Sequence, residues 1–487
     1  SIRDFASLAQ GLLADRYAPL PSRRVYERIG GADLDSVGTG FFDTASVAPK
    51  VGESRRQLKA APLDENLRKN VLQQRTTVAI AENLSEQSEA LRLLHDGLEQ
   101  LPDDHAAVSA FAIASRYAER GQWLLAREVY LYMVDRAPAH PLSAEAYRWL
   151  IRFNTSREAK RRHELKDFGK HEPIMAINKN EGKILRVGNE EPAGAPSSLL
   201  NGPNSRLWSK GAFDFLKRLN GYGPIHGFDA RTQFSVQSAK RQLGELQASH
   251  EWMMKYRKFA ASGPMSDAAQ AELWLVDRSQ PPPRKVGRTR YTEVRPFLDG
   301  KLDDPCWKDW KPMTLDPAHG DTKGYATEAM FAFDQEFLYI ALKCVHPAGK
   351  HVAPLKPRPR DAEVDPFDRV GILLDLDRDY TTCYYLEFDQ RGAVRDTCWD
   401  DRTWNPKCFV AVQSDESSWH IEAAIPLGEL GSDKITANTA WAFNLTRIVP
   451  GRGVQTWSLP ADVIPRPDGM TPLVFDLGKA RPMPAPQ

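Results

Sequence analysis

The C-terminal part of the chain contains the runs Val370-Gly371-Ile372-Leu373-Leu374-Asp375-Leu376 and Trp419-His420-Ile421-Glu422-Ala423-Ala424-Ile425. Each run is short, largely apolar and bounded by Asp, Gly, Asn or Pro residues, which is typical of a β-strand between turns. Five further runs of the same kind are Ala329–Leu342, Cys383–Phe388, Phe409–Val412, Trp441–Arg447 and Gln455–Ser458. Their number and spacing predict an antiparallel β-sandwich.

The N-terminal half of the chain has a helical pattern instead. Apolar residues recur at helical spacing from about residue 62 to residue 153, and again at Leu207–Leu219, Thr232–Ala261 and Met265–Leu275. We therefore predict a multidomain α + β protein, in which α-helical repeats are followed by a C-terminal antiparallel β-sandwich. The predicted divisions are an irregular segment 1–60, helical repeats 61–170, a long loop 171–205, a helical region 206–278, a Pro-rich linker 279–290, the sandwich 291–480 and a tail 481–487.

Residues 114–138 have the spacing of one helical repeat. The positions that carry it are Ala114, Tyr117, Gly121, Ala126, Tyr130 and Pro138. A small Ala lets two antiparallel helices approach, a large side chain fills the groove between them, and Pro ends the second helix. The segment resembles a tetratricopeptide repeat, over about residues 85–140, and the resemblance implies a surface that docks a protein partner. Simple core packing of the aromatic residues is the alternative.

Charge and hydropathy exclude two classes of partner. The 65 Lys and Arg residues against 64 Asp and Glu give a net charge of +1, so the chain has no overall attraction for nucleic acid. The charged segment Arg157–Lys170 is typical of a solvated helix face rather than of a nucleic-acid patch. No run reaches the roughly 18 to 20 apolar residues that span a bilayer. We predict no nucleic-acid partner and no transmembrane segment.

The chain also lacks the usual short motifs of catalysis. It contains no Gly-x-Ser-x-Gly, no His-Glu-x-x-His, no phosphate-binding Gly loop and no cysteine cluster with zinc spacing. Carboxylate pairs such as Glu363 and Asp365 exist, but only their separation across a cleft would make such a pair catalytic. We predict that the protein is not an enzyme.

The predicted strands form part of an ordered series of motifs. The series is Leu298–Trp307, Phe337–Ala341, Asp368–Asp375, Tyr385–Phe388, Trp419–Pro426, Trp441–Arg447 and Thr456–Ser458. In this order it resembles family 9 carbohydrate-binding modules and their relatives, over about residues 294–478. The resemblance implies a β-sandwich, usually secreted, that binds sugar in a tryptophan-lined slot and sometimes holds a structural calcium ion.

A polar loop with two tryptophans is the first candidate for such a slot. Trp399 and Trp404 flank an arginine and two aspartates, and a pyranose offers its C–H face to an aromatic ring. The predicted carbohydrate-binding residues are Trp399, Arg402, Trp404, Asn405, Asn444, Arg447 and Trp457. Two alternatives stay open: the indoles of Trp399 and Trp404 only stabilise a hairpin, and Arg447 pairs with Asp368 or Asp375.

Three carboxylates alternate along the loop that follows the first quoted strand. Asp375, Asp377 and Asp379 can gather hard oxygen ligands around a calcium ion. Arg378 in their midst weakens that attraction, and a solvated strand end is the alternative reading. Apart from this calcium ion, we predict no cofactor.

All five cysteines lie after residue 305, at positions 306, 344, 383, 398 and 408. Cys398 and Cys408 are the best candidates for a disulfide bond, because they stand ten residues apart across a predicted hairpin; unpaired thiols are the alternative. The clustered cysteines, the start at Ser1 without an initiator Met and the resemblance of the sandwich together favour an extracytoplasmic location: periplasmic, cell-surface or secreted.

Three functions fit these patterns. The first is a non-catalytic extracytoplasmic binding protein, whose helices dock a protein partner and whose sandwich binds a carbohydrate or cell-wall glycan. The second is a structural or assembly subunit of a cell-surface or periplasmic complex, with a sandwich that no longer binds sugar. The third is a haem-binding sandwich, because some relatives of this sandwich hold haem between a Met and a basic or His ligand. Candidates for that pair are Met313, Met330, Met470, His319, His346, His351 and His420.

Overall fold

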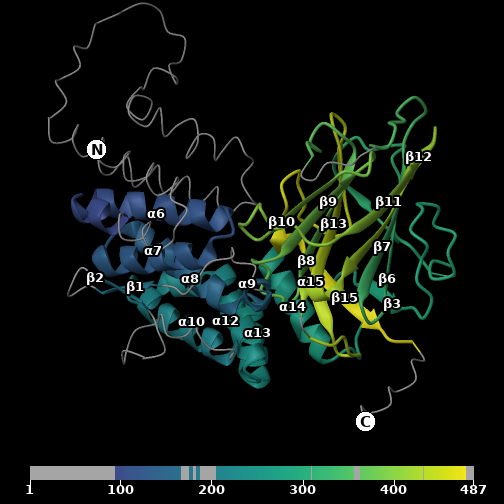
Figure 1. Cartoon of the computed structure of the whole chain (residues 1–487). Helices are drawn as coiled ribbons and strands as arrows, with labels where there is room; N and C mark the ends of the chain where they lie inside the picture. Colours follow the sequence, from purple (N-terminus) through teal and green to yellow (C-terminus); the bar gives the residue numbers. More distant parts are fainter. Residues whose placement is uncertain are drawn as a thin grey trace, which may run out of the picture. The chain divides into compact units, whose positions relative to one another are not determined.

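The structure is a computed structural model, and it describes residues 94–165, 175–178, 183–186, 205–260, 262–308, 310–355, 362–431 and 433–478. The predicted irregular segment 1–60 and the tail 481–487 lie outside the described residues. The chain divides into two compact units. Unit 1 comprises residues 1–150 and 168–202, and unit 2 comprises residues 151–167 and 203–487. Helices come first along the chain and the sheet-rich part follows, which confirms the predicted α + β class (Figure 1).

Unit 1 is built on a pair of packed helices. These are α6 (Asp103–Glu119) and α7 (Trp123–Arg136), and Gly121 turns the chain between them with a φ of 69° that favours glycine. The next helix, α8 (Pro141–Thr155), begins in unit 1 and brings Trp149 to a ring-centroid distance of 4.9 Å from Tyr130. The predicted long loop 171–205 contains the antiparallel strands β1 (Met175–Asn178) and β2 (Lys183–Arg186).

Among the described residues of unit 2, six complete helices precede the large sheet. They are α9 (Arg157–Glu164), α10 (Ser205–Asn220), α11 (Pro224–Phe228), α12 (Ala230–Gln242), α13 (Leu246–Phe259) and α14 (Pro264–Val276). The predicted helix Thr232–Ala261 is two helices, because Gly244 turns the chain with a φ of 85°. Side chains cap two of the helix starts: Ser156 accepts from Ala159 N, and Asp229 accepts from Thr232 N.

The sheet of unit 2 curls so that its two halves face each other (Figure 1). Along it the strands pair in the order β10, β9, β8, β13, β15, β3, β6, β7, β12 and β11. Their bounds are β3 (Gly287–Tyr291), β6 (Thr327–Phe333), β7 (Phe337–Val345), β8 (Arg369–Asp375), β9 (Tyr384–Asp389), β10 (Val394–Cys398), β11 (Phe409–Ser414), β12 (Ser418–Pro426), β13 (Ala440–Val449) and β15 (Thr471–Asp476). Three short strands, β4 (Met313–Thr314), β5 (Asp316–Gly320) and β14 (Gly453–Thr456), extend it, and α15 (Leu427–Leu430) follows β12.

Pairing is antiparallel except at β3, which runs parallel to both β15 and β6 and so joins the two halves. The inner faces of the halves meet in an apolar core. There the Phe331 ring packs edge-on against Phe443, and the Trp419 indole donates a hydrogen bond to Asp368. This arrangement confirms the predicted sandwich-like domain.

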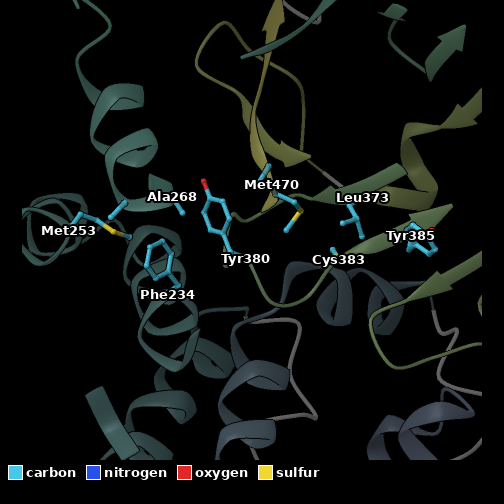
Figure 2. Packing of buried hydrophobic residues seen from close by; sticks show 10 residues of the cluster. Phe234, Met253, Ala268, Leu373, Tyr380, Cys383, Tyr385 and Met470 are labelled. Atoms are coloured by element: carbon cyan, nitrogen blue, oxygen red, sulfur yellow. The ribbon is translucent and has the colours of Figure 1, made fainter. Parts of the chain in front are cut away.

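Helices cover one outer face of the sheet. Phe234 of α12 packs edge-on against Tyr380, which follows β8, at a centroid distance of 5.4 Å. Figure 2 shows Tyr380 between Phe234 and Met470, with Leu373 of β8 in the same cluster. Because this face is covered, every residue of β8 and β9 is buried. Each fully buried apolar side chain stabilises the fold by roughly 1.5 to 3 kcal/mol.

A segment of the chain, residues 295–308, lies over the outer face of the other half, and we call it the strap. Trp307 and Cys306 of the strap pack with Tyr339 and Ala424 of the sheet. Glu422 of β12 holds the strap in place: its carboxylate accepts hydrogen bonds from the Trp307 indole and from the backbone N–H groups of Asp299 and Gly300.

Candidate functional site

The two tryptophans of the predicted sugar slot lie inside the protein. Trp399 is 7 % exposed and Trp404 is 2 % exposed. Trp404 stacks on Tyr384 of β9 with a centroid distance of 4.6 Å, and the backbone N–H of Trp399 bonds to Cys383 O. In the structure neither indole presents a ring face to solvent. Both indoles pack inside the protein next to the turn that follows β10.

Arg447 forms the structural ion pair that was its alternative role. Its Nε lies 2.9 Å from Asp368 Oδ1, and its Nη2 lies 2.6 Å from Asp368 Oδ2. The same guanidinium donates to the carbonyls of Ala326 and Val345. All of these groups are in the inner core, and the hydrogen bonds from Arg447 to the Ala326 and Val345 carbonyls join the two halves of the sheet.

Asn444 is buried as well and holds a turn. Its Nδ2 donates to Ser458 O, and its Oδ1 accepts from Ser458 N. Of the remaining predicted sugar residues, Arg402 and Asn405 are exposed and Trp457 is half-buried, with Lys285 Nζ 4.7 Å from the centre of its ring. Of the seven predicted sugar-binding residues, four are therefore buried and three are exposed or half-buried. The buried ones are Trp399, Trp404, Asn444 and Arg447.

The predicted disulfide bond is absent, and this prediction was wrong. All five cysteines lie in the described part of the chain and carry thiols. Cys398 lies fully buried at the end of β10, where its backbone pairs with Asp401, whereas Cys408 is half-buried just before β11. The two residues belong to opposite edges of the sheet order, because β10 begins it and β11 ends it. No hairpin joins them.

A partly exposed aromatic surface that the sequence did not single out lies at the β11 edge, with Phe409 exposed and Phe337 half-buried. It consists of Phe337, Phe409, Arg295 and Glu336, and we call it the aromatic platform. Phe409 is 53 % exposed and meets Phe337 edge-on at a centroid distance of 6.1 Å. The Arg295 guanidinium lies 5.2 Å above the Phe337 ring and pairs with Glu336 at 3.0 Å.

Strand register explains the aromatic platform. Phe409 of β11 and Tyr339 of β7 are both paired with Ala424 of β12, so they share one row and one face of the sheet. Phe337 stands two residues before Tyr339, on the same face. Alternation within each strand was visible in the sequence, but the register between strands was not.

Two of the three predicted calcium residues, Asp375 and Asp377, lie in one carboxylate cluster, to which a helix adds Glu158, whereas Asp379 is not part of it. Carboxylate oxygens of Glu158, Asp375 and Asp377 lie within 4.8 Å of one another, and all three residues are buried. Glu158 is in the first turn of α9, in the charged segment that we predicted to be solvated. That prediction was wrong, since Glu158, Lys160 and Arg162 are all buried.

Backbone N–H groups orient these carboxylates. Asp375 accepts from the N–H groups of Asp377, Arg378 and Tyr380, and Glu158 accepts from Leu376 N. Asp379 lies beside this group and turns its oxygens to Thr381, Thr382 and Ser235.

Burial dominates the electrostatics of the cluster. Loss of hydration, followed by the charges of Asp377 and Asp379, raises the pKa of Glu158 well above its usual range. Burial and the same two neighbours raise the pKa of Asp375. Burial also lowers the pKa of the Lys160 ammonium to about 7. Ionisation of Glu158 and Asp375 is therefore unfavourable unless a positive charge lies beside them.

Comparison with known proteins gives structural likeness only. No protein-family model and no curated protein matches the chain. A family 9 carbohydrate-binding module from Caldicellulosiruptor kristjanssonii, solved with cellotriose, is 13 % identical, with a TM-score of 0.32 over 42 % of this chain and all of that one. Its complex with glucose gives 15 % identity and a TM-score of 0.31 over 41 % of this chain and all of the module. A candidate carbohydrate-binding protein from Bacteroides uniformis gives 14 % and 0.31, over 39 % of this chain and 99 % of that one.

Likeness at this level of identity and TM-score does not identify a ligand of this chain. Among the described residues, no helix is long and apolar enough to cross a membrane.

Proposed function

We propose that unit 2 is a non-catalytic carbohydrate-binding unit of an extracytoplasmic protein, and that it binds sugar on the aromatic platform. The ordered motifs between residues 294 and 478 support the class of ligand, because they resemble carbohydrate-binding modules. The buried positions of Trp399 and Trp404 move the proposed site away from their loop.

One observation carries the location of this site. Phe409 is a large aromatic residue with more than half of its surface exposed. Next to it lie the Phe337 ring and the charged side chains of Arg295 and Glu336. A pyranose presents an apolar C–H face, which packs on an aromatic ring, and a rim of hydroxyls, which hydrogen-bond to planar polar groups. Phe409 and Phe337 supply the apolar surface, and Arg295 and Glu336 supply donors and acceptors.

The polar rim is already held in position. Arg295 bridges Glu336 and Asp334, and Asp334 also accepts a hydrogen bond from the Tyr339 hydroxyl at 2.9 Å. An ordered guanidinium loses little conformational entropy when a ligand binds, which favours the proposed role.

The test is binding of the full chain to a panel of soluble oligosaccharides by calorimetry, with Phe409→Ala and Arg295→Ala beside the wild type. We expect each substitution to weaken binding by about tenfold or more, equal to about 1.4 kcal/mol. Phe259→Ala is the matched control, because Phe259 is a 90 % exposed phenylalanine on α13. Sugar binding that survives both platform substitutions unchanged would refute the location.

A second candidate function, docking of a protein partner in an assembly, is favoured by apolar side chains on the helices of unit 2. Phe228, Leu246 and Phe259 are 76 %, 62 % and 90 % exposed. A contiguous exposed apolar patch is typical of an interaction surface, and we propose that these residues form part of one. A photo-crosslinking side chain at position 259, introduced in the native host, should capture one defined protein, whereas the same group at exposed Lys255 should not. Equal labelling at both positions would argue against this role.

A further inference from the structure

The carboxylates of Glu158, Asp375 and Asp377 come from two elements that are far apart in the sequence. Glu158 belongs to α9, and the two aspartates belong to the loop that follows β8. The Leu376 backbone N–H, between the two aspartates, donates to Glu158 Oε1 at 2.9 Å. The helix and the loop are therefore in direct contact at this cluster.

One oxygen of the cluster has no partner. Asp377 is 5 % exposed, and its Oδ2 accepts three hydrogen bonds, from Arg157 N, Ser238 Oγ and Gln242 Nε2. Its Oδ1 is buried and accepts none. A buried carboxylate oxygen without a donor costs about 1 to 3 kcal/mol or more, so a native protein normally provides it with a hydrogen-bond donor, a water molecule or an ion.

The nearby cationic side chains are directed to other groups. The ammonium of Lys160 donates to Ser209 and Gln242, and the guanidinium of Arg378 pairs with Glu272. Arg241 donates to the carbonyl oxygens of Asp377 and Arg378, and not to the Asp377 carboxylate. Three buried carboxylates thus share a small volume while the positive charges around them are engaged elsewhere.

This donor set suits a hard divalent cation. All of its atoms are carboxylate oxygens, and calcium accepts such ligands at about 2.3 to 2.6 Å, so that ligands on opposite sides of the ion stand about 4.8 Å apart. The three oxygens lie within 4.8 Å of one another. We propose that Glu158, Asp375 and Asp377 bind a calcium-class divalent cation that links helix α9 to the sandwich.

Such a cation would hold helix α9 against the sandwich, and we call this role a structural clamp. The site is not confined to the sandwich, because Glu158 lies outside residues 291–480. The unfolded chain does not bring Glu158 to the aspartates, so the ion would bind only the folded state and stabilise it by mass action. The clamp is independent of sugar binding on the aromatic platform.

The test uses the full chain, stripped of metal with a chelator and then titrated with calcium chloride while thermal unfolding is followed. At a calcium concentration about 100 times the dissociation constant, we expect the melting temperature to rise by roughly 5 °C or more. Terbium provides a second probe, because Tyr380, whose backbone N–H donates to Asp375 Oδ2, is close enough to the site to sensitise its emission. No rise in melting temperature and no terbium emission up to about 10 mM metal would overturn the proposal.

Two variants locate the ion. Glu158→Gln and Asp377→Asn should lose most of the calcium response, and either of them is sufficient if the other does not fold. Glu422→Gln is the control, since it removes a different buried carboxylate that holds the strap. It should unfold at a lower temperature and still gain the full calcium-induced rise. An undiminished response in both cluster variants would overturn the assignment.

Discussion

Arg447 is a single residue whose type suits sugar binding but whose contacts stabilise the protein core. Its guanidinium makes a bidentate ion pair with Asp368 and is completely buried. Removal of one partner leaves the other charge buried and uncompensated, which costs about 3 to 5 kcal/mol.

We therefore expect Arg447→Ala to lower the free energy of unfolding by about 3 kcal/mol or more, measured by chemical denaturation. Arg452→Ala, at an exposed arginine five residues further along the chain, should change it by less than about 0.5 kcal/mol. A loss below about 1 kcal/mol for Arg447→Ala would contradict the structural role.

Trp404 is an aromatic residue that is also buried in the core. Because it is 2 % exposed and stacked on Tyr384, Trp404→Ala should destabilise the fold by about 3 to 5 kcal/mol. Sugar affinity of the fraction that remains folded should stay unchanged. Calorimetry on the purified variant checks this, and a selective loss of sugar binding with normal stability would restore the Trp404 loop as the site.

At the scale of elements, the strap over the sheet depends on one carboxylate. Glu422 accepts hydrogen bonds from the Trp307 indole and from the N–H groups of Asp299 and Gly300. In Glu422→Ala these donors lose their acceptor, so we expect a loss of about 3 kcal/mol in the free energy of unfolding and faster proteolysis within residues 295–308. Glu416→Ala, at an exposed position before the same strand, should leave both properties unchanged.

The bounds of individual strands could be predicted from the sequence more accurately than the pairing between strands. The runs Val370–Leu376 and Trp419–Ile425 correspond to β8 (Arg369–Asp375) and β12 (Ser418–Pro426) within one residue at each end. The alternation of apolar and polar residues and the turn residues are local signals. They identify a strand but do not show which strand it pairs with. The parallel strand β3 was missed, because its Gly287-Arg-Thr-Arg-Tyr291 sequence lacks an apolar alternation.

Site residues were harder to predict, and the reason is physical. The spacing of Asp375 and Asp377 suggested a metal site, but Glu158 completes the cluster from a helix more than 200 residues away. No local pattern distinguishes a buried charged helix from a solvated one, since burial depends on the surface that the helix meets. The burial of Trp399 and Trp404 could not be predicted from the sequence for the same reason.

At the scale of the whole molecule, the helices of unit 2 and the sandwich form one compact unit. Residues 151–167 and 203–278 belong to the same unit as the sandwich. Phe234, Met253 and Ala268 of these helices bury Leu373 and Tyr385 of the sheet (Figure 2).

A fragment of residues 291–487 should consequently expose apolar surface that residues 151–487 keep buried. We expect the shorter fragment to bind the dye ANS and to unfold at a lower temperature than the longer one, or to aggregate. Equal thermal stability and no dye binding in the shorter fragment would show that the sandwich does not need its helical cover.

Sugar recognition by this unit is tested most directly by a glycan array probed with the full chain and with Phe409→Ala. The account predicts saturable binding to a restricted set of glycans by the wild type, and a loss of about tenfold or more in the variant. Absence of binding to every glycan by a correctly folded chain would contradict carbohydrate binding, and would leave the unit as a component of a protein assembly.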